Sequence, residues 1–356
     1  MSLYHPLRGL YLTRLREFYR QPARLFWVYG FPTVLALGLG LAFQGKVPDA
    51  VPVDLVKNAL SDPVEKALRD HDARARAENR PGVQLRVESA DAAGLRLRTG
   101  KTPLVVEATT SGIAYRFDPT RPEATTARAA IDSILQRQAG RVDKLATEDR
   151  IVKEPGSRYI DFLIPGLIGS NTMGGGLWGV GFLLVNFRIG KLLKRFTATP
   201  MPRRDFLLAI LGARLTFLIP DVAVLLALGV FAFGMPIQGD FLLICVVEVV
   251  GALAFAGIGL LIASRATTTE TVSGLMNLVM LPMWIFSGLF FSTERFPDAL
   301  QPFIQALPLT QLLNALRAVM LEGAGWTSHV VVLALAILGA WAVGSFALAL
   351  RLFRWQ

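Results

Sequence analysis

The chain has 356 residues, of which 53% are hydrophobic and only 18% are charged. Soluble proteins carry about 25% charged residues, and the apolar residues here gather in blocks of about twenty, the length of a membrane-spanning helix. This composition disfavours a soluble fold. The net charge of +10 lies mostly beside apolar blocks, which is typical of cytoplasmic loops, so we expect no nucleic-acid partner.

The first 24 residues predict an amphipathic helix that lies in the cytoplasmic membrane interface. Leu7, Leu10 and Phe18 fall near one helical face, and arginines such as Arg14 fall largely elsewhere. Residues 25–43 follow as the first transmembrane helix. The basic segment before them is long and no small-residue cleavage site follows, so we predict a retained helix and not a signal peptide.

Residues 44–158 have mixed charges, and short apolar runs alternate with turn residues. We predict a separate extracytoplasmic α+β domain here, inserted after the first transmembrane helix. The last two of its predicted strands could form a hairpin. The predicted strands are 51–56, 83–87, 103–108 and 112–117, and the predicted helices are 63–78 and 122–145.

Residues 159–356 predict five further transmembrane helices, so the fold class is an α-helical polytopic membrane protein with about six spans. Lysine and arginine fill the loop 187–205 and the chain's C-terminal end, whereas 234–239 contain neither. By the positive-inside rule both termini are cytoplasmic, and 292–327 form an external re-entrant or helical segment. The five predicted spans are 160–186, 206–233, 240–263, 271–291 and 328–350.

A glycine-rich run, Gly174 to Gly179, lies inside the second span. Its spacing matches a dinucleotide-binding pattern, but that pattern requires a turn between a strand and a helix. We therefore expect Gly175 and Gly179 to allow close helix packing. Cys245 is the only cysteine and lies in an apolar block, so we expect no metal site and no cofactor bound by this chain.

Three ionisable residues interrupt the apolar spans: Arg214, Asp221 and Glu248. Charged groups are costly within a bilayer and face a partner or a watery cavity. Arg214 and Asp221 are seven residues apart and share one helical face. One interpretation is an ion pair that holds the third and fourth spans together; the other is a gating or proton-linked role.

The second and fifth spans mix polar, thioether and aromatic side chains. Such surfaces adapt to varied amphipathic ligands, so they are candidates for a translocation path, although contact with lipid or with other helices explains them almost as well. The candidate path residues are Asn171, Met173, Asn277, Met280 and Trp284.

Two segments resemble the ATP-binding-cassette (ABC) type-two permeases. KLLKRFTATPMPRRDFLLAILGARL, residues 191–215, resembles the cytoplasmic loop that docks onto the ATPase, and GLMNLVMLPMWIFSGLFFSTERFPDALQPFIQALPLTQLLNALRAVMLEG, residues 274–323, resembles the signature around the fifth span. The order of one span, a large external domain and five spans resembles one branch of the family. A positive loop capped by prolines is the simpler interpretation of 191–215.

This resemblance implies roles for two sets of residues. Lys194, Arg195, Phe196, Thr197 and Thr199 would transmit ATPase closure, and Leu289, Phe290 and Phe291 would lie near an outer gate. It also implies that the chain is no enzyme but an exporter permease in a bacterial-type plasma membrane, moving an amphipathic or lipid-like substrate, a drug or a glycan by alternating access.

The implied partners are two ABC ATPase subunits, which bind ATP and Mg, a second permease chain (a homodimer is favoured over a heterodimer), membrane lipid and a candidate extracytoplasmic adaptor. The alternative function is a membrane sensor or assembly scaffold whose 44–158 domain binds a ligand or an adaptor. An intramembrane enzyme is a weaker option, because Asp221 and Glu248 lack an accompanying catalytic motif.

Overall fold

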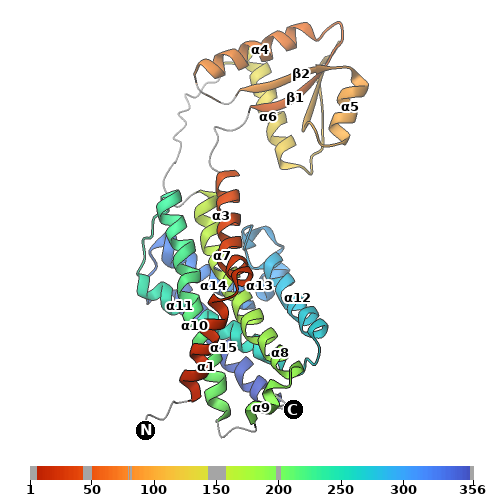
Figure 1. Cartoon of the computed structure of the whole chain (residues 1–356). Coiled ribbons are helices and arrows are strands. Elements are labelled where there is room, and N and C mark those ends of the chain that lie inside the picture. The colour runs from red at the N-terminus through yellow and green to blue at the C-terminus, as the bar shows by residue number, and fades with distance from the viewer. Residues whose placement is uncertain are drawn as a thin grey trace. The chain divides into compact units, whose positions relative to one another are not determined.

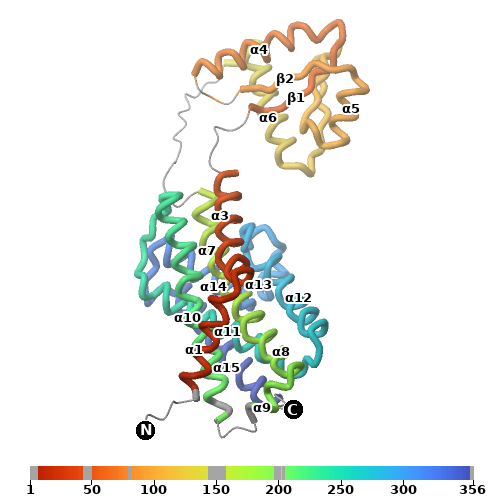
Figure 2. The backbone as a smooth tube through the Cα atoms, viewed as in Figure 1, coloured from red at the N-terminus to blue at the C-terminus, as the bar shows by residue number. Residues whose placement is uncertain are grey.

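The computed structural model describes residues 6–42, 50–78, 80, 82–142, 158–197 and 202–352. Contacts divide the chain into two compact units, one formed by Met1–Gln44 with Lys153–Gln356 and the other by Gly45–Val152. The first unit is a helical bundle and the second contains a β-sheet (Figures 1 and 2).

The described part of the second unit is built on a four-stranded sheet of order β2-β1-β3-β4. The strands β2, β1 and β3 are parallel, and β4 runs antiparallel to β3. Helices connect the parallel strands, because a parallel pair needs a long crossover. The elements are β1 (Val51–Val56), α4 (Asp62–Ala77), β2 (Val83–Glu88), α5 (Ala90–Arg98), β3 (Leu104–Thr109), β4 (Gly112–Phe117) and α6 (Pro122–Gln138).

Both faces of this sheet are covered, because alternate residues of each strand point to opposite sides. Leu55 packs in one cluster with Leu68 of α4 and Ile131 of α6. On the other face, Val105 packs with Ala93 of α5. The covered positions explain why β1 and β3 are rich in valine and leucine.

The predicted strands and the hairpin agree with the structure, but two predictions need correction and one helix was not predicted. The helix predicted to reach 145 ends at Gln138, where Gly140 adopts a positive φ of 96° that glycine permits. The short helix α5 was missed. Because α5 supplies a second crossover on the opposite face, the unit has a layered α/β arrangement and not the predicted α+β arrangement.

The bundle unit contains long helices, several of which continue through a π-helical turn. The first helical stretch is α1 (Pro6–Tyr19), α2 (Pro22–Leu25), η1 (Phe26–Gly30) and α3 (Phe31–Ala42), and the second is α7 (Tyr159–Gly176), η2 (Leu177–Phe182) and α8 (Leu183–Ile189). The remaining elements are α9 (Leu192–Thr197), α10 (Arg203–Ala227), η3 (Leu228–Ala232), α11 (Phe241–Ala263), α12 (Thr269–Phe286), η4 (Thr293–Arg295), η5 (Asp298–Leu300), α13 (Gln301–Ala306), α14 (Pro308–Glu322) and α15 (His329–Leu352).

Among the described residues, four helices are long and apolar enough to cross a membrane: Pro22–Ala42, Asp205–Ala232, Phe241–Ala263 and His329–Leu352. The chain is therefore embedded in the membrane. The other two predicted spans are also helical, as α7–η2–α8 and α12. Their asparagines, glycines and prolines make them less apolar, so the count of six stays a prediction.

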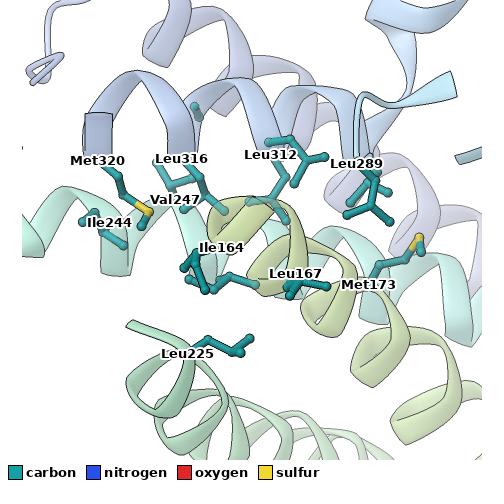
Figure 3. Close-up of a cluster of buried hydrophobic side chains, with 14 of the residues drawn as sticks. Ile164, Leu167, Met173, Leu225, Ile244, Val247, Leu289, Leu312, Leu316 and Met320 are labelled. Carbon is teal, nitrogen blue, oxygen red and sulfur yellow. The ribbon is translucent and has the colours of Figure 1, made fainter. Parts of the chain in front are cut away.

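The core of the bundle centres on α7, α11 and α14 (Figure 3). Ile164 of α7, Val247 of α11 and Leu312 of α14 belong to one buried cluster. The helix α14 lies in the predicted segment 292–327 and is buried along most of its length. This part of the segment therefore completes the core of the bundle.

The fifth predicted span ends earlier than expected. It was predicted to reach residue 291, but α12 ends at Phe286. Gly288 adopts a φ of 78°, which is incompatible with a continuing α-helix. Leu289, Phe290 and Phe291 therefore lie in an irregular turn after the helix.

Candidate translocation and coupling sites

A cavity of about 460 Å³ lies within the bundle unit. Its walls come from the N-terminal helices α1 to η1, from α7, η2 and α8, and from α10. The wall includes four ionisable residues, Arg14, Arg24, Arg214 and Asp221, and five aromatic residues, Phe18, Trp27, Trp178, Phe182 and Phe217.

The N-terminal helix α1 reaches this cavity because it packs against α10. Phe18 is buried and stacks on Phe217 with the ring centroids 4.0 Å apart. The Tyr11 hydroxyl lies 2.7 Å from the Thr216 hydroxyl. The helix α10 therefore covers part of the apolar face of α1, which the sequence predicted to lie in the membrane interface.

Arg214 and Asp221 form a buried ion pair within α10, in which Arg214 Nη1 donates to Asp221 Oδ2 at 3.0 Å. Their spacing of seven residues places them on one face, so two side chains of the same helix can meet. A Cβ on Gly175 would lie 1.9 Å from Arg214 Nη2. Gly175 thus gives the guanidinium room beside α7.

Glu248 lies on α11 and is buried. Its Oε2 accepts a hydrogen bond from Thr172 Oγ1 of α7 at 2.6 Å. The predicted ion pair between the third and fourth spans is therefore wrong: the pair is internal to α10, and Glu248 instead bonds to the second span. The sequence could not reveal this because the hydrogen bond joins residues 76 positions apart.

The close approach of α11 to the end of α7 and to η2 depends on Gly176 and Gly181, and not on the predicted pair. A Cβ on Gly181 would lie 2.5 Å from the Gly259 carbonyl oxygen, and one on Gly176 would lie 2.5 Å from Phe255 Cβ. Gly175 and Gly179 instead face Arg214. The run of glycines therefore serves two neighbours, α10 and α11.

The five candidate path residues separate into three places. Asn171 borders the cavity and its Nδ2 donates to the Val28 carbonyl at 3.2 Å. Met173 and Met280 are packed in the buried core. Asn277 and Trp284 are exposed on α12. The cavity within this chain thus includes only Asn171 among these five residues.

The turn of Leu289, Phe290 and Phe291 is held by Arg317 of α14, a residue that the sequence reading did not select. Arg317 Nη2 donates to the Gly288 carbonyl at 2.7 Å, and its guanidinium lies 3.6 Å from the centroid of the Phe162 ring. Leu289 is buried, whereas Phe291 is exposed. The sequence offered one signal for this role, because Arg317 is a charged residue within the mostly apolar segment 308–320.

The predicted coupling loop contains the short helix α9. Lys194 and Arg195 are exposed. The backbones of Phe196 and Thr197 belong to α9, and Thr199 lies outside the described residues. Leu193 is buried and anchors the helix to a cluster that includes Phe206.

Arg188 lies on the last turn of α8, just before α9, and bonds to the end of α11. Its Nη1 donates to the carbonyls of Ala263 at 2.7 Å and of Ala266 at 2.5 Å, and its Nη2 donates to the Ser264 carbonyl at 3.5 Å. These carbonyls lie where α11 ends, and the last carbonyls of a helix lack partners within it. Arg188 therefore joins the end of α8 to the end of α11.

Comparison with known proteins gives a family match over most of the chain. Residues 23–351 match the family described as "ABC-2 family transporter protein". The chain is 29% identical over 187 residues to ABC transporter G family member 20 of Dictyostelium discoideum, which covers 50% of this chain and 25% of that protein. It is 29% identical over 130 residues to nodulation protein J of Bradyrhizobium diazoefficiens, covering 36% and 48% respectively. Each match thus spans less than half of the relative's length.

Proposed function

We propose, from the premise that this chain belongs to the ABC-2 family of transporter proteins, that it is the permease subunit of an ATP-driven exporter. The family makes it a membrane transport component and not a catalytic subunit, and such permeases work with ABC ATPase partners. In our proposal two separate ATPase subunits bind ATP and Mg, two permease chains form the path, and the substrate is an amphipathic or lipid-like molecule, a drug or a glycan.

The observation that carries the proposal is the attachment of α9 to two helix ends. A turn of two residues, Gly190 and Lys191, joins α9 to α8. A displacement of α9 is therefore transmitted directly to the end of α8. Arg188 holds that end against residues 263–266. Closure of an ATPase against Lys194 and Arg195 would then tilt α8 and α11 together, a rigid-body movement of the kind that alternating access needs.

An exposed apolar face on α12 supports pairing with a second permease chain or contact with lipid. Leu278, Leu281 and Ile285 are all more than half exposed in the single chain, and large exposed apolar patches mark protein or membrane contacts. We propose a homodimer in a bacterial-type plasma membrane, with both termini in the cytoplasm and the 44–158 domain outside it. An adaptor could extend the path there.

The test is copurification of the chain with an ATPase encoded beside its gene, followed by measurement of complex formation and of ATP hydrolysis in the presence of substrates. We expect the double variant Lys194→Glu/Arg195→Glu to reduce the yield of complex at least tenfold, because charge reversal opposes docking. We expect Arg188→Gln to keep the complex but to lower substrate export by an order of magnitude.

Arg351→Glu is the matched control, since this exposed arginine lies in the last turn of α15, on the same predicted side of the membrane. It should leave complex and export near the wild-type level. Failure of the wild-type chain to form a complex with any ATPase would contradict the proposal. Accessibility labelling that finds Lys194 outside the cell would also contradict the proposal. Binding of a ligand or regulator by the 44–158 domain would then favour the sensor alternative.

A further inference from the structure

The cavity described above has an excess of positive charge. Arg14, Arg24 and Arg214 line it, against one lining carboxylate, that of Asp221. Arg14 is paired with Glu17, which does not line the cavity, and Arg214 is paired with Asp221. Among the described residues, Arg24 is therefore the lining arginine without an ion-pair partner. Arg24 makes a cation–π contact with the Phe18 ring at 6.0 Å. The balance favours an anionic ligand.

The buried ion pair leaves polar atoms unsatisfied. Within the described part of the chain, Arg214 Nε and Nη2 and Asp221 Oδ1 have no hydrogen-bond partner. An arginine presents five N–H donors in a planar fork that suits phosphate and carboxylate groups. In a membrane, buried polar atoms need partners from protein, water or ligand. An oxyanion next to Arg214 would accept hydrogen bonds from Nε and Nη2, whereas Asp221 Oδ1 is itself an acceptor and needs a donor such as water.

Aromatic side chains make the rest of the wall suitable for an apolar body. Trp27 and Trp178 line the cavity together with Phe217, and Trp27 is 63% exposed. The volume of about 460 Å³ lies within the range of roughly 300–1,000 Å³ found for small-molecule sites. A charged head and an attached hydrocarbon segment fit this combination of walls.

We propose that this cavity is a binding site, within one chain, for an amphipathic molecule that carries a phosphate or carboxylate head. The head contacts Arg24 and Arg214, and the apolar body lies against Trp27, Trp178 and Phe217. The site is formed by α1 to η1, α7 to α8 and α10, and needs neither an ATPase nor a second permease chain. It therefore stands or fails separately from the proposed function.

The first experiment measures binding of dodecyl phosphate to the full-length chain, purified in dodecyl maltoside, by the change in tryptophan fluorescence. Dodecanol is the neutral probe of the same chain length. We expect saturable binding of dodecyl phosphate that is at least tenfold tighter than that of dodecanol, because the charged head adds charge-assisted hydrogen bonds. Equal affinity for the two probes would overturn the proposal.

The variants separate this site from general attraction to a basic protein. Arg24→Gln should weaken dodecyl phosphate binding at least tenfold, whereas Arg20→Gln, an exposed arginine of the same segment that does not line the cavity, should not change it. Arg214→Gln/Asp221→Asn replaces the ion pair by neutral polar groups and should also weaken binding tenfold. If Arg20→Gln and Arg24→Gln weaken binding equally, the site is refuted.

Arg24→Gln keeps the test decisive if the buried double variant does not fold, because Arg24 is only partly buried. Two arms then distinguish the source of the head group. Displacement of dodecyl phosphate by inorganic phosphate supports recognition of a free anion. Retention of phosphatidylglycerol by wild-type chain but not by Arg24→Gln, in bilayer nanodiscs that contain both phosphatidylglycerol and phosphatidylcholine, supports a lipid head group. Absence of both effects overturns the proposal.

Discussion

Glu248 is the clearest example of a single residue whose surroundings decide its role. It is buried on α11, and one of its oxygens, Oε1, has no partner in the described part of the chain. The other accepts the hydrogen bond from Thr172. Among the described residues, the Thr172 hydroxyl is therefore the hydrogen-bond donor to this carboxyl group, and their hydrogen bond links α7 to α11.

We predict that Thr172→Val lowers the free energy of unfolding by about 1–3 kcal/mol, because it removes the donor and leaves a buried acceptor unsatisfied. Glu248→Gln keeps an acceptor for Thr172, so it should lower transport more than it lowers stability. Thermal unfolding in detergent, measured beside export in cells, checks both variants.

Thr13→Val is the control for this prediction, because the Thr13 hydroxyl is exposed and donates only to the nearby Gly9 carbonyl among its described contacts. It should change the free energy of unfolding by less than about 0.5 kcal/mol. If Glu248→Gln reduces protein yield and activity equally, the carboxyl group serves the structure and not transport.

At the scale of elements, the contact between η2 and α11 depends on the absence of side chains. Gly181 and Gly259 approach each other closely enough that a Cβ on Gly181 would meet the Gly259 carbonyl oxygen at 2.5 Å. Backbone atoms cannot move aside as a flexible side chain can. Small residues are the usual means by which membrane helices approach each other.

We predict that Gly181→Ala destabilises the chain by about 1–3 kcal/mol, the range for overpacking in a well-packed interior. Gly339→Ala is the matched control on α15, because apart from the nearby backbone of α15 no described atom lies within 4 Å of the added methyl group. It should leave stability unchanged or raise it by up to about 1 kcal/mol. Equal melting temperatures for the two variants would show that the helices separate without cost.

For the whole molecule, the two units have separate cores, since the residues of the sheet unit cluster with one another. The sheet unit also contains a group that responds to pH. Burial, together with the positive charges of Arg74 and Arg80, lowers the pKa of His71 below its ordinary value of 6.5. The unfolded unit therefore binds a proton more readily than the folded unit.

We predict that a fragment of residues 50–142 folds on its own and loses stability as the pH falls below about 6.5, because protonation of His71 then favours the unfolded state. His71 contributes its full stability above that pH. His71→Gln should flatten this part of the profile, and Arg69→Gln, an exposed arginine that pairs with Glu65, should retain it. Urea unfolding between pH 5 and 8 measures the difference.

Local sequence patterns determined most of the elements. The apolar blocks predicted the long helices because their length matches a bilayer, and short apolar runs between turn residues, such as residues 51–56, predicted the strands. The prediction lost accuracy where one residue changes the backbone. Gly288 and Gly140 follow the ends of α12 and α6, and the sequence does not reveal the positive φ of either glycine.

The sequence by itself determined that this chain is a membrane protein, and its motifs indicated the family, because hydrophobicity and loop charge act locally. Only the tertiary structure decided which partners the isolated charges have. Arg214 pairs within its own helix, Glu248 bonds to Thr172, and Arg317 holds the turn after α12. Buried polar groups take the partners that packing brings to them, and helix packing joins residues that are far apart in the chain.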